Sequence, residues 1–318
     1  MKVLVIKTSS MGDVVHALPA VTDMQRHVQG LQVDWLVEAP FAAIPALHPG
    51  VRRVIPLGWR KWRKSLFSAG TQALLRAFRA DLRAERYDVV LDLQGLLKSV
   101  MWTLQARGPS AGYDVRSARE RLAGLFYRRT ARVPRHTEIQ AVERCRRLAA
   151  AHLGYAMPAT PPEFGIRAPE PGWPVPAASH AVLIPGASRP EKLWPEDRWI
   201  GVGRELLARG MTPVVLWGSR DEEAMAQRIA AGCEGLVPPF LTVRGAAGLL
   251  GHARQVVGLD TGFTHLAAAF GRPTIGIYCD YEPGLAAVTG SGPVASLGGV
   301  GQVPALDDVL RTLSSDRA

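Results

Sequence analysis

Runs of strand length and runs of helix length alternate along the whole chain, and this alternation limits the fold more than any other feature. The strand-like runs are KVLVIK (2–7), QVDWLVE (32–38), VRRVIPL (51–57), YDVVLDLQG (87–95), HAVLIPG (180–186), TPVVLWG (212–218), QVVGLD (255–260) and TIGIY (274–278). Helix-like periodicity occurs at about 13–28, 71–86, 195–209, 221–231 and 262–270. Because strands separated by helices pair in parallel, the sequence predicts an α/β protein with mostly parallel sheets.

A proline-rich segment divides this alternation in two. Residues 156–178 contain seven prolines, a density that excludes a long helix or a central strand. We interpret the segment as the connection between an N-terminal domain, 1–160, and a C-terminal domain, 178–318, a division that the length of the chain allows. The last periodic run, ALDDVLRTL (305–313), predicts a terminal helix, for which packing back on the first domain is one option.

Charge is distributed unevenly between the two halves. Residues 1–150 hold 25 Lys and Arg against 12 Asp and Glu, whereas residues 151–318 hold 13 against 16. The first half therefore predicts an acidic partner: nucleic acid, anionic lipid or a multiply charged substrate. A basic solvated surface is the alternative. Three widely spaced cysteines, no membrane-length apolar run and a first apolar run too short for a signal peptide favour a cytoplasmic protein, and no cluster has metal-ligand spacing.

Polar loops that follow strands are the candidate sites, because ligands of open α/β sheets bind at the carboxyl ends of strands. The first loop contains Ser10, Gly12 and Asp13. We expect Gly12 to allow a sharp turn and Asp13 to begin a helix, where it is either a plain cap or an acceptor of a hydroxyl proton. The absence of a G-x-G-x-x-G pattern argues against a dinucleotide cofactor.

Three further loops lie in the second half. In DTGFTH, Asp260 or Thr261 caps a helix whose first turn, at Gly262, can bind a pyrophosphate, with His265 one turn further. The alternative is a plain cap with a core histidine. Ser188 and Lys192 lie on a long loop. The lysine either neutralises the charge that develops on a leaving diphosphate or is a solvated surface residue. Glu222 either binds a ribose diol or complements a helix dipole.

Basic residues dominate the remaining candidates. WRKWRK (59–64) places Arg60, Lys61, Arg63 and Lys64 beside two tryptophans, which suit either a phosphate-rich membrane surface or an exposed linker. Lys98 and Arg119 are expected to extend this positive surface. In the helix predicted at 71–86, one face holds Leu74, Leu75, Phe78 and Leu82, and another holds Arg76, Arg79, Arg83 and Arg86.

Several of these segments together resemble one family. The segments KTSSMGDVVHALPA (7–20), WRKWRK, QGLLKS (94–99), SARE (117–120), KLWP (192–195) and VVGLDTGFTHLAAAFGRP (256–273) look like the lipopolysaccharide heptosyltransferases, glycosyltransferase family 9, in particular the members that add the first heptose of the inner core. The resemblance implies a GT-B fold, that is, two Rossmann-like doubly wound domains facing a central cleft. It implies inverting, metal-independent transfer from ADP-L-glycero-D-manno-heptose to Kdo2-lipid A, without a cofactor.

The resemblance also implies roles for individual residues. Asp13 would be the general base, with Lys192 as a second catalytic residue. The donor would be bound by Ser188, Lys192, Glu222, Asp260, Thr261, Gly262 and His265. The acceptor would be bound by Ser10, Gly12, Arg60, Lys61, Arg63, Lys64, Lys98 and Arg119. The chain departs from the family where Cys279–Pro283 replaces the common G-P-T-D-P, at Ala187, where a hydroxyl is expected, and at Pro185–Gly186.

The resemblance places the protein at the cytoplasmic face of the inner membrane, as a peripheral monomer without a nucleic-acid partner. Within the family, the alternative is heptosyltransferase II or another core glycosyltransferase. From other classes, the alternatives are a non-catalytic basic nucleic-acid-binding protein and an NAD-dependent oxidoreductase.

Overall fold

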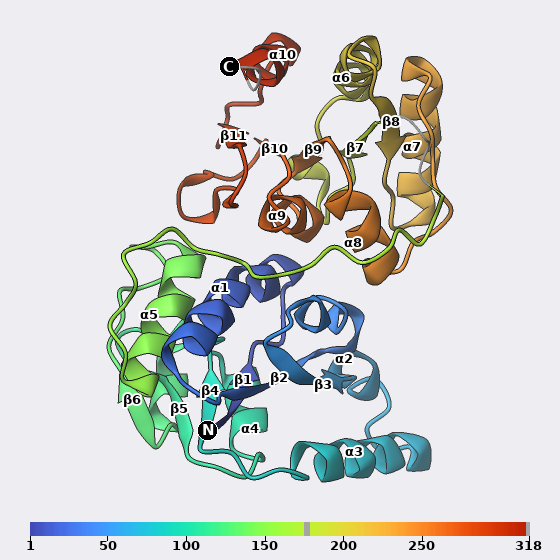
Figure 1. Cartoon of the computed structure of the whole chain (residues 1–318). Coiled ribbons are helices and arrows are strands. Elements are labelled where there is room, and N and C mark those ends of the chain that lie inside the picture. Colours follow the sequence, from blue (N-terminus) through green and yellow to red (C-terminus); the bar gives the residue numbers. More distant parts are fainter. Residues whose placement is uncertain (175–178, 316–318) are drawn as a thin grey trace. The chain divides into compact units, whose positions relative to one another are not determined.

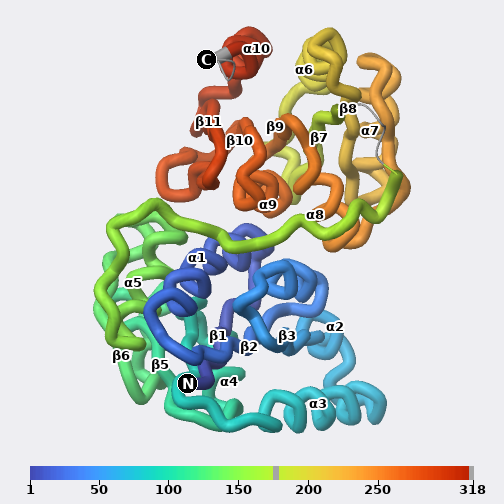
Figure 2. The backbone as a smooth tube through the Cα atoms, viewed as in Figure 1, coloured from blue at the N-terminus to red at the C-terminus, as the bar shows by residue number. Residues whose placement is uncertain are grey.

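The computed structural model describes residues 1–174 and 179–315, which form two compact units (Figure 1). Unit 1 is Met1–Gly165 and unit 2 begins at Ile166. The division lies inside the proline-rich segment 156–178. After the helix α5 (Ala141–Leu153) the chain runs through residues 155–174 without a helix or strand, as the backbone trace shows (Figure 2). The prolines of this segment have no backbone N–H to donate in a helix or a sheet, which accounts for the absence of regular structure.

Unit 1 is a six-stranded parallel sheet. Its strands are β1 (Lys2–Ile6), β2 (Gln32–Glu38), β3 (Val51–Leu57), β4 (Val89–Asp92), β5 (Ser110–Tyr113) and β6 (Arg129–Ala131), in the order β3-β2-β1-β4-β5-β6. Its helices are α1 (Met11–His27), α2 (Trp59–Trp62), α3 (Ala69–Leu82), α4 (Leu97–Thr103) and α5 (Ala141–Leu153), with short 3₁₀ turns η1 (Ala39–Phe41), η2 (Pro45–Leu47) and η3 (Arg121–Leu125). The strand order reverses between β1 and β4, which makes that position the topological switch point.

Two helical layers cover the sheet of unit 1. On one face α1 packs against α5 (Figure 1), and the buried Arg146 of α5 pairs with Asp23 of α1 at 2.6 Å. On the other face α3 and α4 pack on Leu4, Ile6 and other strand residues. The helix α1 continues through Pro19 without a break.

The segment 59–82 differs in two details from the prediction. Trp62 packs edge-on against Phe78, and Phe78 against Trp102, each with ring centroids 5.3 Å apart. The side chains of Trp62 and Trp102 therefore belong to the core rather than to a membrane interface. Leu74 is 51% exposed, so it does not share the buried face of Leu75, Phe78 and Leu82. Because α3 ends at Leu82, Arg83 and Arg86 lie beyond the helix, and the predicted helical arginine stripe is shortened.

Unit 2 is a five-stranded parallel sheet. Its strands are β7 (His180–Ile184), β8 (Thr212–Val215), β9 (Gln255–Leu259), β10 (Thr274–Tyr278) and β11 (Val294–Gly298), in the order β11-β10-β9-β7-β8. Its helices are α6 (Glu196–Ala208), α7 (Arg220–Cys233), α8 (Val243–Gly251), α9 (Gly262–Ala269) and α10 (Leu306–Ser315), with turns η4 (Pro190–Lys192) and η5 (Gly284–Ala286). The switch point here lies between β7 and β9.

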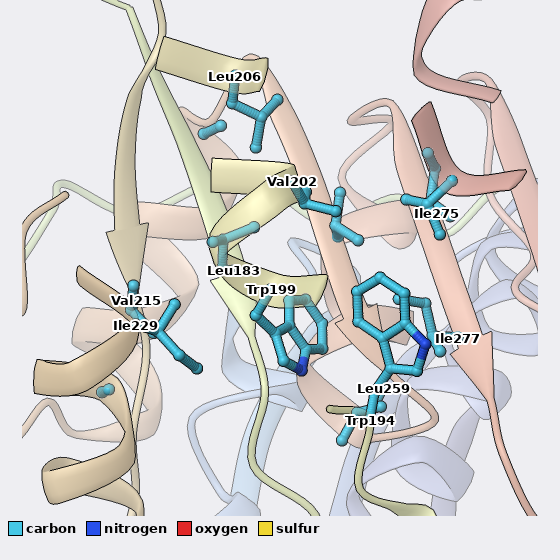
Figure 3. Packing of buried hydrophobic residues seen from close by; sticks show 14 of the residues in the cluster. Leu183, Trp194, Trp199, Val202, Leu206, Val215, Ile229, Leu259, Ile275 and Ile277 are labelled. Carbon is cyan, nitrogen blue, oxygen red and sulfur yellow. The ribbon is translucent and has the colours of Figure 1, made fainter. Parts of the chain in front are cut away.

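The core of unit 2 forms between the sheet and the helices α6, α7 and α10 (Figure 3). Trp194 and Trp199 pack edge-on against each other, with ring centroids 5.1 Å apart, in the same cluster as strand residues such as Leu183 and Ile277. Val309 and Leu313 of α10 are buried in the same cluster, and α10 contacts α6 and β11. The apolar face of α10 is therefore used within unit 2.

Cys145, Cys233 and Cys279 are buried and unpaired. Across the described residues, none of the helices has the length and apolarity needed to cross a bilayer.

Candidate functional site

The loop between β1 and α1 lies at the switch point of unit 1 and is held by a neighbouring side chain. The buried Gln94, which follows β4, accepts hydrogen bonds from the backbone N–H groups of Thr8 at 2.9 Å and Ser9 at 3.3 Å. Its Nε2 donates to the carbonyl of Ser9 at 2.5 Å. One amide therefore satisfies both donors and an acceptor of the loop that leads to Asp13. The fold fixes this loop across the β1–β4 boundary.

Asp13 lies in the first turn of α1 rather than at its cap. Ser10 is the N-cap, and its backbone N–H and hydroxyl each donate to Asp13 Oδ2 at 3.0 Å. The other oxygen, Oδ1, lies 3.5 Å from Lys7 Nζ and 3.6 Å from Arg119 Nη1. Oδ2 is therefore used by the capping hydrogen bonds, whereas Oδ1 faces two cations. Gly12 is the second residue of α1, so the turn expected there occurs before it.

The surroundings of Asp13 favour its ionised form. Burial raises the pKa of Asp13, but the charge of Lys7 and the Ser10 N–H together outweigh it. Arg119 and His16 act in the same direction, so the pKa lies below its usual range. Asp13 is therefore a carboxylate throughout the neutral range.

The predicted cations collect around this carboxylate to different degrees. Lys98 donates to Ser9 Oγ at 2.8 Å, and burial together with Arg60 lowers its pKa. Arg119 contacts Asp13 directly. Of the segment 59–64, Arg60 and Arg63 act electrostatically on Glu38, whereas Lys61 and Lys64 are exposed on the same turn.

Glu38 is a buried carboxyl that sequence reasoning missed. It ends β2, is 6% exposed, and its Oε2 has no hydrogen-bond partner. Burial raises the pKa of Glu38, while Arg60 and Lys98 oppose the shift. Its backbone N–H donates to the Thr8 carbonyl at 3.1 Å, which links the β2 end to the same loop. The available signal was its position as the last residue of a buried strand.

Gln94→Ala tests the support of the β1–α1 loop. The variant removes both the acceptor and the donor that hold Thr8 and Ser9, so Asp13 loses its fixed position. We expect kcat to fall roughly 10–100-fold with the donor KM unchanged, because small displacements of catalytic groups have effects of this size. Gln94→Glu keeps the acceptor oxygen and should restore part of the loss. A lower melting temperature with unchanged kcat would assign Gln94 a purely structural role.

In unit 2, the loops after β7 and β9 bring three predicted residues together. Asp260 follows β9, and its Oδ2 accepts from Lys192 Nζ at 2.7 Å. Its Oδ1 lies 3.3 Å from His265 Nε2, one turn into α9. Thr261 is the N-cap residue of α9 and Gly262 its first residue, so the first-turn N–H groups lie beside this triad. The arrangement joins a cation to a helix N-terminus, both of which attract anions.

The hydrogen-bond partners of Asp260 favour its ionised form. Burial raises the pKa of Asp260, but hydrogen bonding with His265 and Lys192 outweighs it and lowers the pKa to about 2. Since the ordinary value is 3.8, the carboxylate adds stability above that pH, and the contribution is lost as pH falls toward 2.

Asp260→Asn should therefore give a pH-dependent stability difference. Near neutral pH the variant should be less stable by about 2 kcal/mol, the free energy that this pKa shift represents. The difference should shrink as pH falls from 3.8 to about 2, where Asp260 of the native protein becomes protonated. Denaturant unfolding at several pH values measures it, and a difference that is constant with pH would contradict the shift.

The other donor-side candidates lie on the neighbouring loops. Glu222 accepts from the Gly218 N–H at 2.7 Å, and a Cβ at Gly186 would lie 2.6 Å from Glu222 Cδ. The glycine at 186 therefore leaves room for this carboxylate. Ser188 is exposed on the same loop. Ala187 packs against the core of unit 2, which explains an apolar residue where a hydroxyl was expected.

The departing segment Cys279–Pro283 gains a contact that the sequence did not reveal. Asp280 accepts from Arg189 Nη2 at 2.7 Å, so the loop after β10 is tied to the loop that bears Lys192. Across residues 1–174 and 179–315, no group of three or more His, Cys, Asp and Glu side chains could hold a metal ion.

Two doubly wound units in one chain, each with its polar loops at the switch point, define a glycosyltransferase of the GT-B class. The chain belongs to glycosyltransferase family 9, the heptosyltransferases, whose model matches residues 75–297. The predicted GT-B fold and glycosyltransferase class are confirmed. A non-catalytic nucleic-acid-binding protein and an NAD-dependent oxidoreductase are therefore set aside.

Individual relatives agree with this assignment. Lipopolysaccharide heptosyltransferase 1 of Escherichia coli K12 is 43% identical over 288 residues, which are 90% of each chain. The solved structure of E. coli heptosyltransferase WaaC with ADP has a TM-score of 0.91 at 38% identity and covers 99% of this chain and 100% of that one. The same enzyme with ADP-2-deoxy-2-fluoro heptose has a TM-score of 0.88, with the same identity and coverage. The resemblance that the sequence motifs indicated is confirmed.

Proposed function

We propose that this chain transfers L-glycero-D-manno-heptose from ADP-heptose to a Kdo hydroxyl of Kdo2-lipid A, with inversion and without a metal. The observation that carries the proposal is the contact of Lys192 and His265 with Asp260 at the N-terminus of α9. This site suits a sugar diphosphate, and a relative with 38% identity has been solved with ADP and with an ADP-heptose analogue. Unit 2 is accordingly the donor domain and unit 1 the acceptor domain.

In the proposed donor site, groups of the protein itself balance the negative charge of the diphosphate. Hydrogen bonds come from the first-turn N–H groups at Thr261 and Gly262, and a positive charge comes from the ammonium of Lys192. Lys192 is already in place, because Asp260 orients it. Glu222 lies near Gly186 and Ser188, where its free lone pairs can accept from the ribose hydroxyls.

Acceptor binding explains the basic character of unit 1. Kdo carboxylates and lipid A phosphates are anions, and Arg60, Arg63 and Lys98 form a group of cations beside the β1–α1 loop. Ser10 of that loop and Gly12 of α1 border the acceptor hydroxyl, and Arg119 contacts the Oδ1 atom of Asp13. Lys61 and Lys64 contribute from the exposed side of α2.

The chemical step is one displacement. Asp13 Oδ1 accepts the proton of the Kdo hydroxyl as that oxygen attacks the anomeric carbon of the heptose. The bond to the ADP oxygen breaks on the opposite face, so the configuration inverts. Lys192 and the helix N-terminus stabilise the negative charge that develops on ADP. Because the pKa of Asp13 is low, proton transfer is favourable only as the attacking oxygen becomes acidic in the transition state.

The direct test is ADP release from ADP-heptose with and without Kdo2-lipid A. We expect release that depends on Kdo2-lipid A, a product one heptose heavier, and turnover that persists in a chelator. Release that requires an already heptosylated core would instead favour the heptosyltransferase II alternative. Loss of turnover in the chelator, restored by a divalent cation, would overturn metal independence.

Neutralising Arg60, Lys61, Arg63 and Lys64 together to glutamine should weaken acceptor binding. We expect the KM for Kdo2-lipid A to rise roughly tenfold or more, since each cation near an anionic surface contributes about 1 kcal/mol. The KM for ADP-heptose should not change. Steady-state kinetics at two salt concentrations measures both values, and an unchanged acceptor KM would remove the segment from the acceptor site.

A further inference from the structure

Two neighbouring elements of unit 1 expose large apolar side chains to solvent. On α4, Leu97, Met101 and Leu104 are 42%, 36% and 53% exposed, and their spacing places them on one helix face. In and just after η3, Leu122, Leu125 and Phe126 are 59%, 66% and 50% exposed. We call these six residues the α4–η3 surface.

The two groups of apolar residues are neighbours because α4 and η3 are in contact. Glu120, at the start of η3, accepts from the Leu97 N–H at 2.6 Å, and its own N–H donates to the Gly95 carbonyl at 3.1 Å. Soluble monomers seldom leave this much contiguous apolar area open, and such surfaces usually mark a docking site.

An arginine-lined cavity borders the surface at one end. The cavity measures about 390 Å³ and lies at the amino ends of β4, β5 and β6, where Arg86, Arg107 and Arg128 line it. Arg128 lies two residues beyond Phe126, and Arg107 three residues beyond Leu104. Three guanidinium groups around one cavity match a phosphate group.

At the other end the surface meets the candidate acceptor site. Lys98 of α4 and Arg119, just before η3, both border Asp13 and its loop. Arg121 within η3 is exposed. The two nearby acids, Glu120 and Asp114, accept backbone N–H groups and so partly satisfy their charge locally. The charge around the apolar residues is therefore predominantly positive.

We infer that the α4–η3 surface docks the protein on an anionic lipid bilayer, with the cavity taking the phosphate of a lipid headgroup. Apolar side chains enter the interfacial region while the cations on both ends meet headgroup phosphates. Both elements run from the carboxyl edge of the sheet to the amino edge, so the surface extends from Asp13 to the cavity. The inference rests on the proposed function, in which the acceptor is itself a lipid.

The test is flotation of the full chain with vesicles of phosphatidylethanolamine and phosphatidylglycerol. We expect the native protein to bind and Leu125→Glu/Phe126→Glu to bind roughly tenfold more weakly or worse, since two apolar contacts are lost and two anions are introduced. Val300→Glu/Val303→Glu places the same charges on exposed valines of unit 2 and should bind like the native protein. Native protein that does not bind, or equal binding of both variants, would overturn the inference.

The cavity is tested separately. Arg86→Ala/Arg107→Ala should weaken binding to the phosphatidylglycerol vesicles several-fold, and weaken binding to phosphatidylcholine vesicles less, because choline balances the charge of that headgroup phosphate. Arg244→Ala/Arg254→Ala, which removes two exposed arginines of unit 2, is the matched control. Equal binding of the two double variants would show that the cavity takes no headgroup.

Two further outcomes would contradict the inference. One moves membrane docking to another surface, and the other gives the α4–η3 surface another partner. Phe67 is 98% exposed near the 59–64 segment, and loss of vesicle binding in Phe67→Glu but not in Leu125→Glu/Phe126→Glu would move the docking surface there. A native dimer that becomes monomeric in Leu125→Glu/Phe126→Glu, with vesicle binding intact, would assign the surface to a second copy of the chain.

Turnover with a deacylated, water-soluble acceptor separates this inference from the proposed function. Leu125→Glu/Phe126→Glu should turn over that acceptor like the native protein and lose activity only on vesicles. If the native protein transfers no heptose to the soluble acceptor, the proposed function fails, whatever the vesicles show. Equal activity of variant and native protein on vesicles would overturn the docking surface alone.

Discussion

Asp13→Asn should lower kcat by roughly 10²–10⁴-fold, the usual contribution of a general base. Asparagine keeps an oxygen that can accept from the Ser10 N–H and hydroxyl, so the first turn of α1 should persist. It removes the anion at Oδ1, the atom proposed to accept the proton. Steady-state kinetics together with ADP-heptose binding measures the effect, and donor affinity should be nearly unchanged because Asp13 belongs to the other unit.

The pH dependence provides an internal control for this variant. Because the pKa of Asp13 lies below its usual range, the native kcat/KM should show no acid limb attributable to Asp13 near the ordinary carboxyl value of 3.8. Asp13→Asn should lower the whole profile without shifting it. Near-native turnover in Asp13→Asn, with an unchanged melting temperature, would end the assignment of Asp13 as the base.

Lys192→Ala should be the second most damaging change, with kcat lower by roughly 10²–10³-fold, the cost of losing one preorganised charge-stabilising group. The variant also leaves the carboxylate of Asp260 without its 2.7 Å partner, beside the proposed diphosphate. Donor affinity should therefore fall as well, which distinguishes this variant from Asp13→Asn. Calorimetric titration with ADP and single-turnover kinetics separate the two effects.

Lys192→Arg and the double variant Lys192→Ala/Asp260→Asn are the controls. The arginine variant keeps the charge and should recover part of the ADP affinity. The double variant removes the stranded carboxylate, so ADP should bind better than to Lys192→Ala, although kcat stays low. If Lys192→Ala binds ADP and turns over normally, Lys192 is a solvated residue.

The sequence predicted three strands to the residue: QVDWLVE, VRRVIPL and TIGIY coincide with β2, β3 and β10. For β2 and β10 the reason is burial, since a sheet covered on both faces requires mostly apolar strands. The edge strand β3 is only partly buried, and turn residues on either side of it gave its bounds. The sequence did not predict β5, β6, α4 or α8. Strand β5 has the sequence SAGY, and α8 contains three glycines. Glycine has a low propensity for both strands and helices, so tertiary contacts must stabilise these two elements.

Within the candidate site, the sequence indicated residues on loops after strands but not what holds them. Asp13, Lys192, Asp260 and His265 stand out because charge follows an apolar run. Gln94 gave no such signal, since its function is to hydrogen-bond a loop 85 residues away. The tryptophans of the segment 59–64 gave a signal, but it led to a wrong environment. Their amphipathic side chains suit a core and a membrane interface equally well, so the sequence did not distinguish the two.

The ion pair at Asp260 has a consequence for ligand selection. In the empty protein the ammonium of Lys192 already has a counterion 2.7 Å away, so an incoming anion must compete with a carboxylate of the same chain. Under the proposed function, inorganic phosphate gains little from that exchange, because it brings only its charge. ADP-heptose gains contacts with its base, ribose and sugar ring at the same time. On that proposal the internal carboxylate disfavours small abundant anions, and only a larger ligand that makes additional contacts displaces it from the lysine.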